Sequence, residues 1–347
     1  MCSRSTLGQT SGSNPRSGPK EVLRSVSIYT FIPFTAQLPL PLTHPLQMPS
    51  KARSLLELTR LHWFPVGSDF MFWPFAWGSL AASYRVALPM NKVVMNTLFY
   101  ALLGTLVHSA GCVINDMLDR EFDRKVERSK DRPIASGAVT VPEASVLLIM
   151  LVAAIFYMFS TAGPTALLLG LVGLPACGGT YPLMKRWMYW PSLYLGFAAS
   201  WAVPFTWVAI TGEFDWGMIL NVGVASCCWT CLYDTIYACQ DKKDDEKAGV
   251  KSMAVRLGDG IRPALSVFDV TFFVCLLWAG YLNGQHLPFY VIGVIAPFLL
   301  CLWHIWSFDH NDPRDSWKKF TAGRHGAALV CVGLVVDHYC NLASLAI

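Results

Sequence analysis

The sequence predicts an all-α, polytopic membrane protein with nine transmembrane helices. The 347-residue chain is 54% hydrophobic and only 14% charged, whereas a soluble domain carries about 25% charged residues. A spanning helix needs about 20 mostly apolar residues. Nine stretches approach this length, at 66–84, 93–114, 144–161, 164–181, 190–211, 217–238, 264–282, 287–306 and 326–345.

The distribution of basic residues supports this division of the chain. Of the 27 Lys and Arg residues, 25 lie before the first stretch or in every second loop, and only Arg85 and Lys92 lie elsewhere. Basic loops mark one side of a membrane, so the N-terminus and these loops are expected on the same side. Because the positive charge is spread over membrane loops, the net charge of +4 does not indicate nucleic-acid binding.

The chain is expected to consist of an N-terminal segment, residues 1–54, and a nine-helix domain, residues 55–347. The first 50 residues are rich in Ser, Pro and Thr, and their only acidic residue is Glu21. A Ser-rich, acid-poor segment of this kind fits a mitochondrial transit peptide or an unstructured cytosolic tail. Its few Arg residues and its Pro-broken apolar part favour the tail, and therefore the endoplasmic reticulum or Golgi over the mitochondrial inner membrane.

A first acidic cluster follows the second apolar stretch. Asp116, Asp119 and Asp123 stand at i, i+3 and i+7, directly after Asn115. If the helix continues this far, the three carboxylates lie on one face. A cation is then needed between them, because three adjacent carboxylates repel one another.

A second acidic cluster appears four helices later. Asp234, Asp241 and Asp245 stand at i, i+7 and i+11, with Asp244 beside them and Tyr237 on the same predicted helical face. Asp234 falls inside an apolar stretch, where an acid costs about 2.5–3.5 kcal/mol on insertion scales. An intramembrane acid is a functional-site hypothesis by default.

Both clusters end a helix on the basic side, which suggests a shared site. Paired carboxylates suit a hard cation, Mg²⁺ above all, and Mg²⁺ prefers a few carboxylates together with a substrate's phosphates. Basic side chains suited to phosphate lie in the same loops: Lys125, Arg128, Arg132, Lys185 and Arg186. The predicted ligand is a diphosphate on a lipid-soluble tail. A cation or diphosphate transporter is the alternative, although its acids would be expected at mid-membrane on broken helices.

Four segments of the chain resemble the UbiA superfamily of intramembrane prenyltransferases. They read NDMLDREFD from Asn115, DRPIASG from Asp131, TYPLMKR from Thr180 and YDTIYACQDKKDDEKAGVKS from Tyr233. The last is similar to the form found in 4-hydroxybenzoate polyprenyltransferases. The resemblance extends from about Leu55 to the C-terminus.

This resemblance implies nine helices around a central cavity, bound Mg²⁺, an isoprenyl diphosphate donor and a phenolic aromatic acceptor. By position, the metal and diphosphate would be held by Asn115, Asp116, Asp119, Asp123, Asp241, Asp244 and Asp245. The resemblance places Arg128, Arg132 and Lys185 near diphosphate or acceptor. Asp234 leads the second motif and is the candidate for orienting or deprotonating the acceptor, with Tyr237 beside it.

One segment departs from the ubiquinone-pathway pattern. Members of that pathway resemble R-L-D-K-P-I-G before the first helix, whereas this chain has RLHWFPVG from Arg60, one residue longer and with Trp63 and Phe64 in place of a cation. The segment looks more like members that prenylate polyketide-derived rings in fungal meroterpenoid pathways. Farnesyl transfer to such a ring is therefore expected, with 4-hydroxybenzoate prenylation for ubiquinone as the alternative.

Overall fold

The computed structural model describes residues 50–125, 129–175, 180–249 and 251–345. All regular secondary structure in these ranges is helical, as the sequence predicts. The chain divides into the units Met1–Gln47 and Met48–Ile347, and only the second is described. The predictions for residues 1–49 therefore lie outside the described residues, while the expected boundary after residue 54 falls within the first helix.

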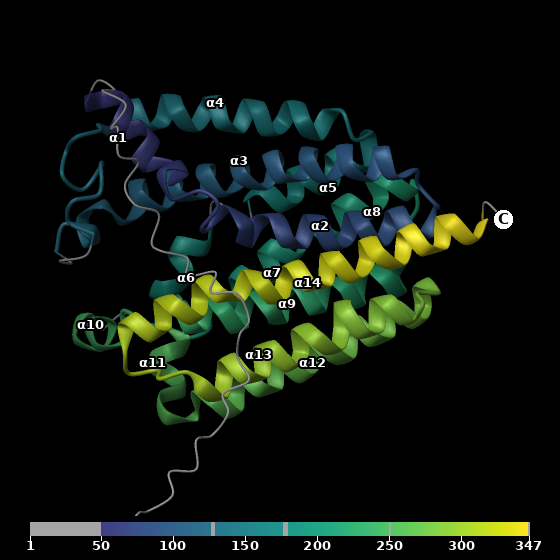
Figure 1. Ribbon diagram of the computed structural model, residues 1–347. Coiled ribbons are helices and arrows are strands. Elements are labelled where there is room, and N and C mark those ends of the chain that lie inside the picture. The colour runs from purple at the N-terminus through teal and green to yellow at the C-terminus, as the bar shows by residue number, and fades with distance from the viewer. Residues whose placement is uncertain (1–49, 126–128, 176–179, 250, 346–347) are drawn as a thin grey trace, which may run out of the picture. The chain divides into compact units, whose positions relative to one another are not determined.

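The described part of the chain contains long helices joined by short helical turns (Figure 1). In chain order they are α1 (Ser50–Leu58), η1 (Leu61–Trp63), α2 (Ser68–Arg85), α3 (Met90–Asp123), α4 (Val141–Ser160), α5 (Pro164–Pro175), α6 (Tyr181–Trp187), α7 (Pro191–Ser200), α8 (Ala202–Thr211), α9 (Trp216–Ala238), α10 (Lys242–Ala248), α11 (Met253–Leu257), η3 (Gly258–Gly260), α12 (Ile261–Asn283), η4 (Phe289–Ile295), α13 (Ala296–Ser307) and α14 (Pro313–Leu345).

Seven helical segments within the described residues are long and apolar enough to cross a membrane. They are α3, α4, α7 with α8, α9, α11 through α12, η4 with α13, and α14. The remaining two predicted spans coincide with α2 and with α5, which has only 12 residues. The structure thus shows a helical membrane protein, and the number nine stays a prediction.

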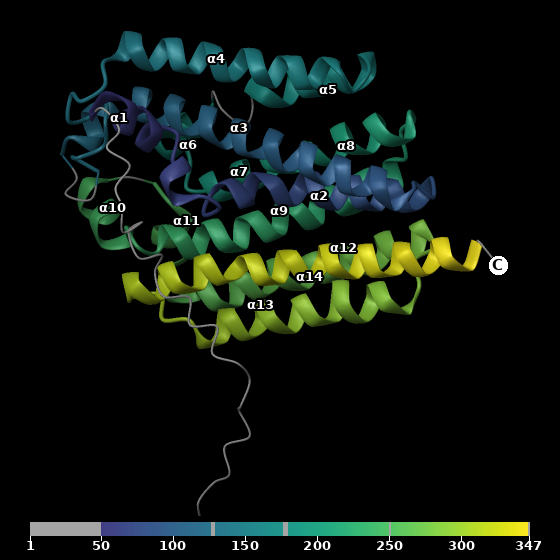
Figure 2. The same ribbon diagram turned by 45° about the horizontal axis from the view of Figure 1, so that its top comes forward.

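Helices α2 and α9 lie at the centre of the bundle. Helix α9 packs against α12, α7 and α14, whereas α2 packs against α3, α8 and α14. Figures 1 and 2 show the long helices running side by side, with the short α1, α6, α10 and α11 gathered at one end. Helix α3 ends and α14 begins at this same end. The short helices therefore surround the ends that carry the acidic clusters.

Side-chain caps begin several of the helices. Thr140 and Glu143 form a capping box at the start of α4, in which each side chain accepts the backbone N–H of the other residue. Asp215 Oδ1 accepts the Met218 N–H at the start of α9. These caps satisfy N–H groups that the first helical turn leaves without partners.

Glycines allow helix backbones to approach closely, as is common in membrane bundles. A Cβ atom on Gly333 of α14 would lie 2.5 Å from the Cα atom of Gly293 in η4. A Cβ on Gly196 of α7 would lie 2.6 Å from the Cys227 carbonyl oxygen of α9. Neither position has space for a larger residue, so the sequence needs glycine there for these helices to pack.

We expect Gly333→Ala to lower the melting temperature of the detergent-solubilised protein. Overpacking of this kind costs about 1–3 kcal/mol, more than the roughly 1 kcal/mol that alanine gains over glycine in a helix. Gly223→Ala is the matched control, because a Cβ there meets nothing within 4 Å. Equal effects of the two substitutions on thermal unfolding would contradict the close approach of α14 and η4.

Candidate active site

The first acidic cluster lies on one unbroken helix. Helix α3 runs for 34 residues and ends at Asp123, so the expectation that the helix continues through the cluster is confirmed. The side chains of Asp116 and Asp123 are buried, with residue exposures of 1% and 7%. Burial of an ionised carboxylate is tolerated only with a close cationic partner.

Arg132 is the cation between these two carboxylates. Its Nη1 lies 3.3 Å from Asp116 Oδ1 and 3.0 Å from Asp123 Oδ2. The sequence requires a cation at this place, and the structure identifies it. The loop holds Arg132 through turns, because the Arg132 N–H donates to the Ser129 carbonyl and the Ser129 hydroxyl to the Asp123 carbonyl. Buried Ile134 anchors the same loop against the core.

Arg60 is a second partner of Asp116 that the sequence analysis did not identify. Its Nη2 lies 2.9 Å from both carboxylate oxygens of Asp116, and its Nη1 donates to the Glu57 carbonyl. Its backbone has φ 61°, in the left-handed region that non-glycine residues rarely adopt. Burial would lower the pKa of Arg60, but Asp116, with Cys112 and Tyr237 nearby, raises it overall. Arg60 therefore stays charged beside Asp116.

The second acidic cluster does not lie on one continuous helix, which corrects the predicted i, i+7, i+11 face. Helix α9 ends at Ala238, Asp241 lies in a turn, and α10 begins at Lys242. The Gln240 and Asp241 N–H groups bond to carbonyls three residues back, which tightens the chain out of the α-helix. The chain turns where the apolar stretch gives way to Gln240 and the charged residues after it, so Asp245 is carried on a separate short helix.

Tyr181 shows that the two clusters nevertheless converge. This residue begins α6, outside the seven spans. Its pKa is raised well above the usual value, first by burial and then by the charges of Asp234, Asp119 and Asp245, with a contribution from Tyr237. Carboxylates from α3, α9 and α10 thus all act electrostatically on one hydroxyl, and α3 contacts α6. Tyr181 belongs to the segment TYPLMKR and Tyr237 to the predicted face of the second cluster.

Aromatic side chains form one wall beside this acidic group. The ring of Tyr237 lies 4.8 Å from that of Phe320, centroid to centroid, and Trp317 lies 5.8 Å from Phe320. Trp63 meets Trp317 edge to face at 5.4 Å and 87°. The departure noted in the sequence at Trp63 thus lies against α14, on the side of Tyr237.

The other predicted residues are placed less fully. Lys125 is exposed just after α3, and Asp244 is exposed with its carboxylate 3.8 Å from Lys247 Nζ. Arg128 lies outside the described residues, and the structure describes the backbone but not the side chains of Lys185 and Arg186. The phosphate contacts predicted for Lys125, Arg128, Lys185 and Arg186 stay predictions.

The carboxylates of the candidate site fit a divalent cation only if oxygen atoms of a substrate complete its coordination shell. Among the described residues, no group of three or more His, Cys, Asp or Glu side chains is close enough to hold a metal by itself. Mg²⁺ rarely uses an all-protein cage and takes one or two carboxylates together with waters and phosphate oxygens. The carboxylates around Tyr181 offer the oxygen ligands that such a shared shell requires.

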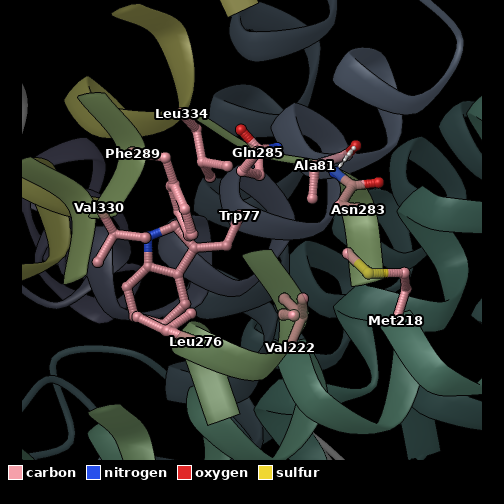
Figure 3. A pocket seen from close by; sticks show the side chains of 11 residues that line it. Trp77, Ala81, Met218, Val222, Leu276, Asn283, Gln285, Phe289, Val330 and Leu334 are labelled. Atoms are coloured by element: carbon pink, nitrogen blue, oxygen red, sulfur yellow. Dashed lines mark hydrogen bonds between the residues drawn. The ribbon is translucent and has the colours of Figure 1, made fainter. Parts of the chain in front are cut away.

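Two apolar pockets lie away from these carboxylates. One is lined by Trp77, Leu276 and Phe289, with the amide groups of Asn283 and Gln285 in its wall (Figure 3). A second is lined almost entirely by apolar side chains and reaches from α2 and α3 to α5 and α8. Neither contains a predicted site residue, so converging charge rather than cavity size identifies the candidate site.

We expect Arg60→Gln to lower the melting temperature, because it removes the closer of the two guanidinium partners of buried Asp116 and leaves only Arg132. Complete loss of the partner of a buried charge costs about 3–5 kcal/mol, so a part of this cost is expected. Adding Asp116→Asn should restore part of this loss. Arg53→Gln is the control, since Arg53 pairs with Glu57 on the exposed face of α1 and such pairs contribute little. A melting temperature for Arg60→Gln equal to that of the control would contradict a structural role for the pair.

Comparison with known proteins gives relatives along most of the chain. The sequence model of the UbiA prenyltransferase family matches residues 71–329. The UbiA prenyltransferase claS of Ampulloclitocybe clavipes is 40% identical over 84% of this chain and 93% of its own length. The mitochondrial 4-hydroxybenzoate polyprenyltransferase of Schizosaccharomyces pombe is 36% identical over 79% of this chain and 76% of its own.

Solved structures share the fold. A UbiA homologue from Aeropyrum pernix K1 superimposes with a TM-score of 0.64 at 24% identity, covering 77% of this chain and 97% of that one. A homologue from Archaeoglobus fulgidus, bound to GPP and Mg²⁺, gives 0.58 at 17% identity and covers 82% and 99%. With its family match, its relatives and its helical membrane fold, the chain belongs to the UbiA prenyltransferase family and is an aromatic prenyltransferase.

Proposed function

We propose that this protein catalyses the Mg²⁺-dependent transfer of a farnesyl group from its diphosphate to a ring carbon of a polyketide-derived phenolic acid. The observation that carries the proposal is the convergence of Asp119, Asp234 and Asp245 around Tyr181, at the end of the bundle where Arg132 lies. The A. fulgidus homologue solved with GPP and Mg²⁺ supports an isoprenyl diphosphate as donor and Mg²⁺ as metal.

In this proposal the two acidic segments share one metal–diphosphate group. Asn115 and Asp119 would offer oxygen ligands from α3, and Asp241 and Asp245 from the opposite segment. Asp116 and Asp123 both pair with Arg132. They would contribute to the site by holding the Arg132 guanidinium in position. When bound, Mg²⁺ would neutralise the charge that develops on the diphosphate.

Transfer breaks the bond between C1 of the prenyl group and the diphosphate oxygen, which leaves with the electron pair. Lys125, Arg128, Arg132, Lys185 and Arg186 are the proposed phosphate contacts, because cationic side chains stabilise developing negative charge. A ring carbon of the acceptor then bonds to C1 and loses its proton. Asp234, with Tyr237 one turn later, is the proposed group to orient the acceptor or take this proton.

The apolar interior of the bundle excludes water from the allylic cation. The apolar pocket between α2, α3, α5 and α8 suits an isoprenyl tail, because it lies within the bundle and carries no charged side chain. Helices α2 and α5 would complete nine spans around this interior.

The second candidate function is prenylation of 4-hydroxybenzoate for ubiquinone. It is favoured by the S. pombe relative and by two 4-hydroxybenzoate geranyltransferases of Lithospermum erythrorhizon at 35% identity. Trp63 and Phe64, in place of a cation beside the aromatic wall, favour the polyketide-derived ring. The two functions also differ in location, which we propose to be the endoplasmic reticulum or Golgi for the first and the mitochondrial inner membrane for the second.

Removal of divalent metal should abolish product formation, and Mg²⁺ should restore it.

Asp241→Asn should lower kcat by about a hundredfold or more, because it removes charge that acts on the transition state. Glu121→Gln is the control, since Glu121 lies exposed at the same membrane face and pairs with Arg124. Metal-independent turnover, or equal kcat for the two variants, would refute a shared metal–diphosphate site.

An acceptor screen distinguishes the two candidate functions. Membranes that contain the protein would receive farnesyl or geranylgeranyl diphosphate with Mg²⁺, together with orsellinate or 4-hydroxybenzoate. We expect a farnesylated product from orsellinate by mass spectrometry. Product from 4-hydroxybenzoate alone would assign the protein to the second function, and no product from any phenol would refute both.

A further inference from the structure

We propose that Lys319, in the second turn of α14, binds the phosphate of an anionic phospholipid on the outer surface of the bundle. This inference is independent of the proposed function, because the residues that carry it belong to neither acidic cluster. The lipid site lies where α13 ends and α14 begins, at the end of the bundle that carries the acidic clusters (Figure 1).

Two cations from different helices contact the last residues of α13. Lys319 Nζ donates to Ser307 Oγ, and Nη2 of Arg262, in α12, donates to the Phe308 carbonyl oxygen at 2.7 Å. The carbonyl end of a helix stabilises nearby cations. Neither cation forms an ion pair with an acidic residue of the described ranges, and Asp315 acts on Lys319 only at longer range. The positive charge at this helix end is therefore not balanced by a close carboxylate.

The stem of Lys319 is buried, but its ammonium reaches the lipid-facing surface. The residue is 7% exposed, whereas its contacts Ser307 and Trp303 are exposed residues of α13. Nζ lies 4.3 Å from the centroid of the Trp303 ring, which is a cation–π contact. A basic side chain near a helix end often buries its stem and keeps its charge at the membrane interface. Besides the N–H that Ser307 accepts, the ammonium has further donors for an anion.

The surroundings of Lys319 favour a phospholipid over a free phosphate ion. The side chains of Trp303 and Trp306 are 60% and 57% exposed, and tryptophan near the end of a membrane helix marks the boundary between headgroups and acyl chains. An acyl chain can lie on these rings while the phosphate accepts N–H groups from Lys319. Basic pockets between membrane helices bind lipid headgroups in this way. A phosphate without a tail would make the polar contacts alone and bind more weakly.

Native mass spectrometry of the full-length protein in detergent tests this site. The protein would be titrated with phosphatidylglycerol, phosphatidylcholine and glycerol 3-phosphate, which is a headgroup without a tail. We expect phosphatidylglycerol to bind about fivefold or more tighter than either of the others, and Lys319→Gln to weaken it about fivefold, the contribution of one basic residue near an anionic surface. Glycerol 3-phosphate binding as tightly as phosphatidylglycerol would show a site for free phosphate and overturn the proposal.

Lys318→Gln is the matched control, because it removes the same charge from the exposed neighbouring position. We expect it to change the affinity for phosphatidylglycerol less than about twofold, since solvent ions screen exposed charges. Equal losses for the two lysine variants would show a general attraction of lipid to the basic face and overturn a site at Lys319.

Trp303→Leu tests the same site without a change of charge. The substitution keeps an apolar side chain at a lipid-exposed position, so it spares the core and decides the matter if Lys319→Gln does not fold. We expect it to weaken phosphatidylglycerol binding about twofold to fivefold, because it removes the aromatic ring that holds the ammonium in place. Wild-type affinity in Trp303→Leu would overturn the proposal.

Discussion

The pairing of Asp116 with Arg60 and Arg132 is the interaction on which the rest of the candidate site depends. A carboxylate exposed by only 1% at the end of a membrane helix is tolerated because two guanidinium groups surround it. One comes from the turn before α2 and the other from the loop after α3, so a single side chain joins three segments. The end of α3 is thereby fixed in place, and Asp119 with it.

This arrangement separates carboxylates that organise the site from those proposed to bind substrate. Asp116 and Asp123 hold Arg132 in position, and their charges are largely compensated within the protein. The charges of Asp119, Asp234 and Asp245 instead act on Tyr181, and these are carboxylates proposed to face the substrates. In the proposed function a divalent cation lies between carboxylates and the diphosphate, so metal and donor would bind together.

The sequence predicts those parts of the site that depend on local periodicity. The shared face of α3 and the need for a cation beside Asp116 follow from helical spacing and from repulsion between carboxylates, and the structure confirms both. The break after Ala238 was missed because the same spacing suits a helix and a turn followed by a second helix, and only the backbone bonds at Gln240 distinguish them.

Other features could not be read from the sequence because they depend on contacts between distant segments. Arg60 lies 56 residues from Asp116, and nothing local marks it as a partner of that carboxylate. The contact between Trp63 and Trp317 likewise joins the two ends of the domain.

The central claim is that the two acidic segments form one site, and a double-mutant cycle tests it most directly. Mg²⁺-dependent binding of farnesyl diphosphate would be measured for the wild-type protein, Asp119→Asn, Asp245→Asn and the double variant. Residues that hold one metal–diphosphate group should show coupling of about 0.5–3 kcal/mol, so that the double variant loses a different amount of affinity from the sum of the single losses. Strictly additive losses would mean that the two segments act independently, and would contradict the account.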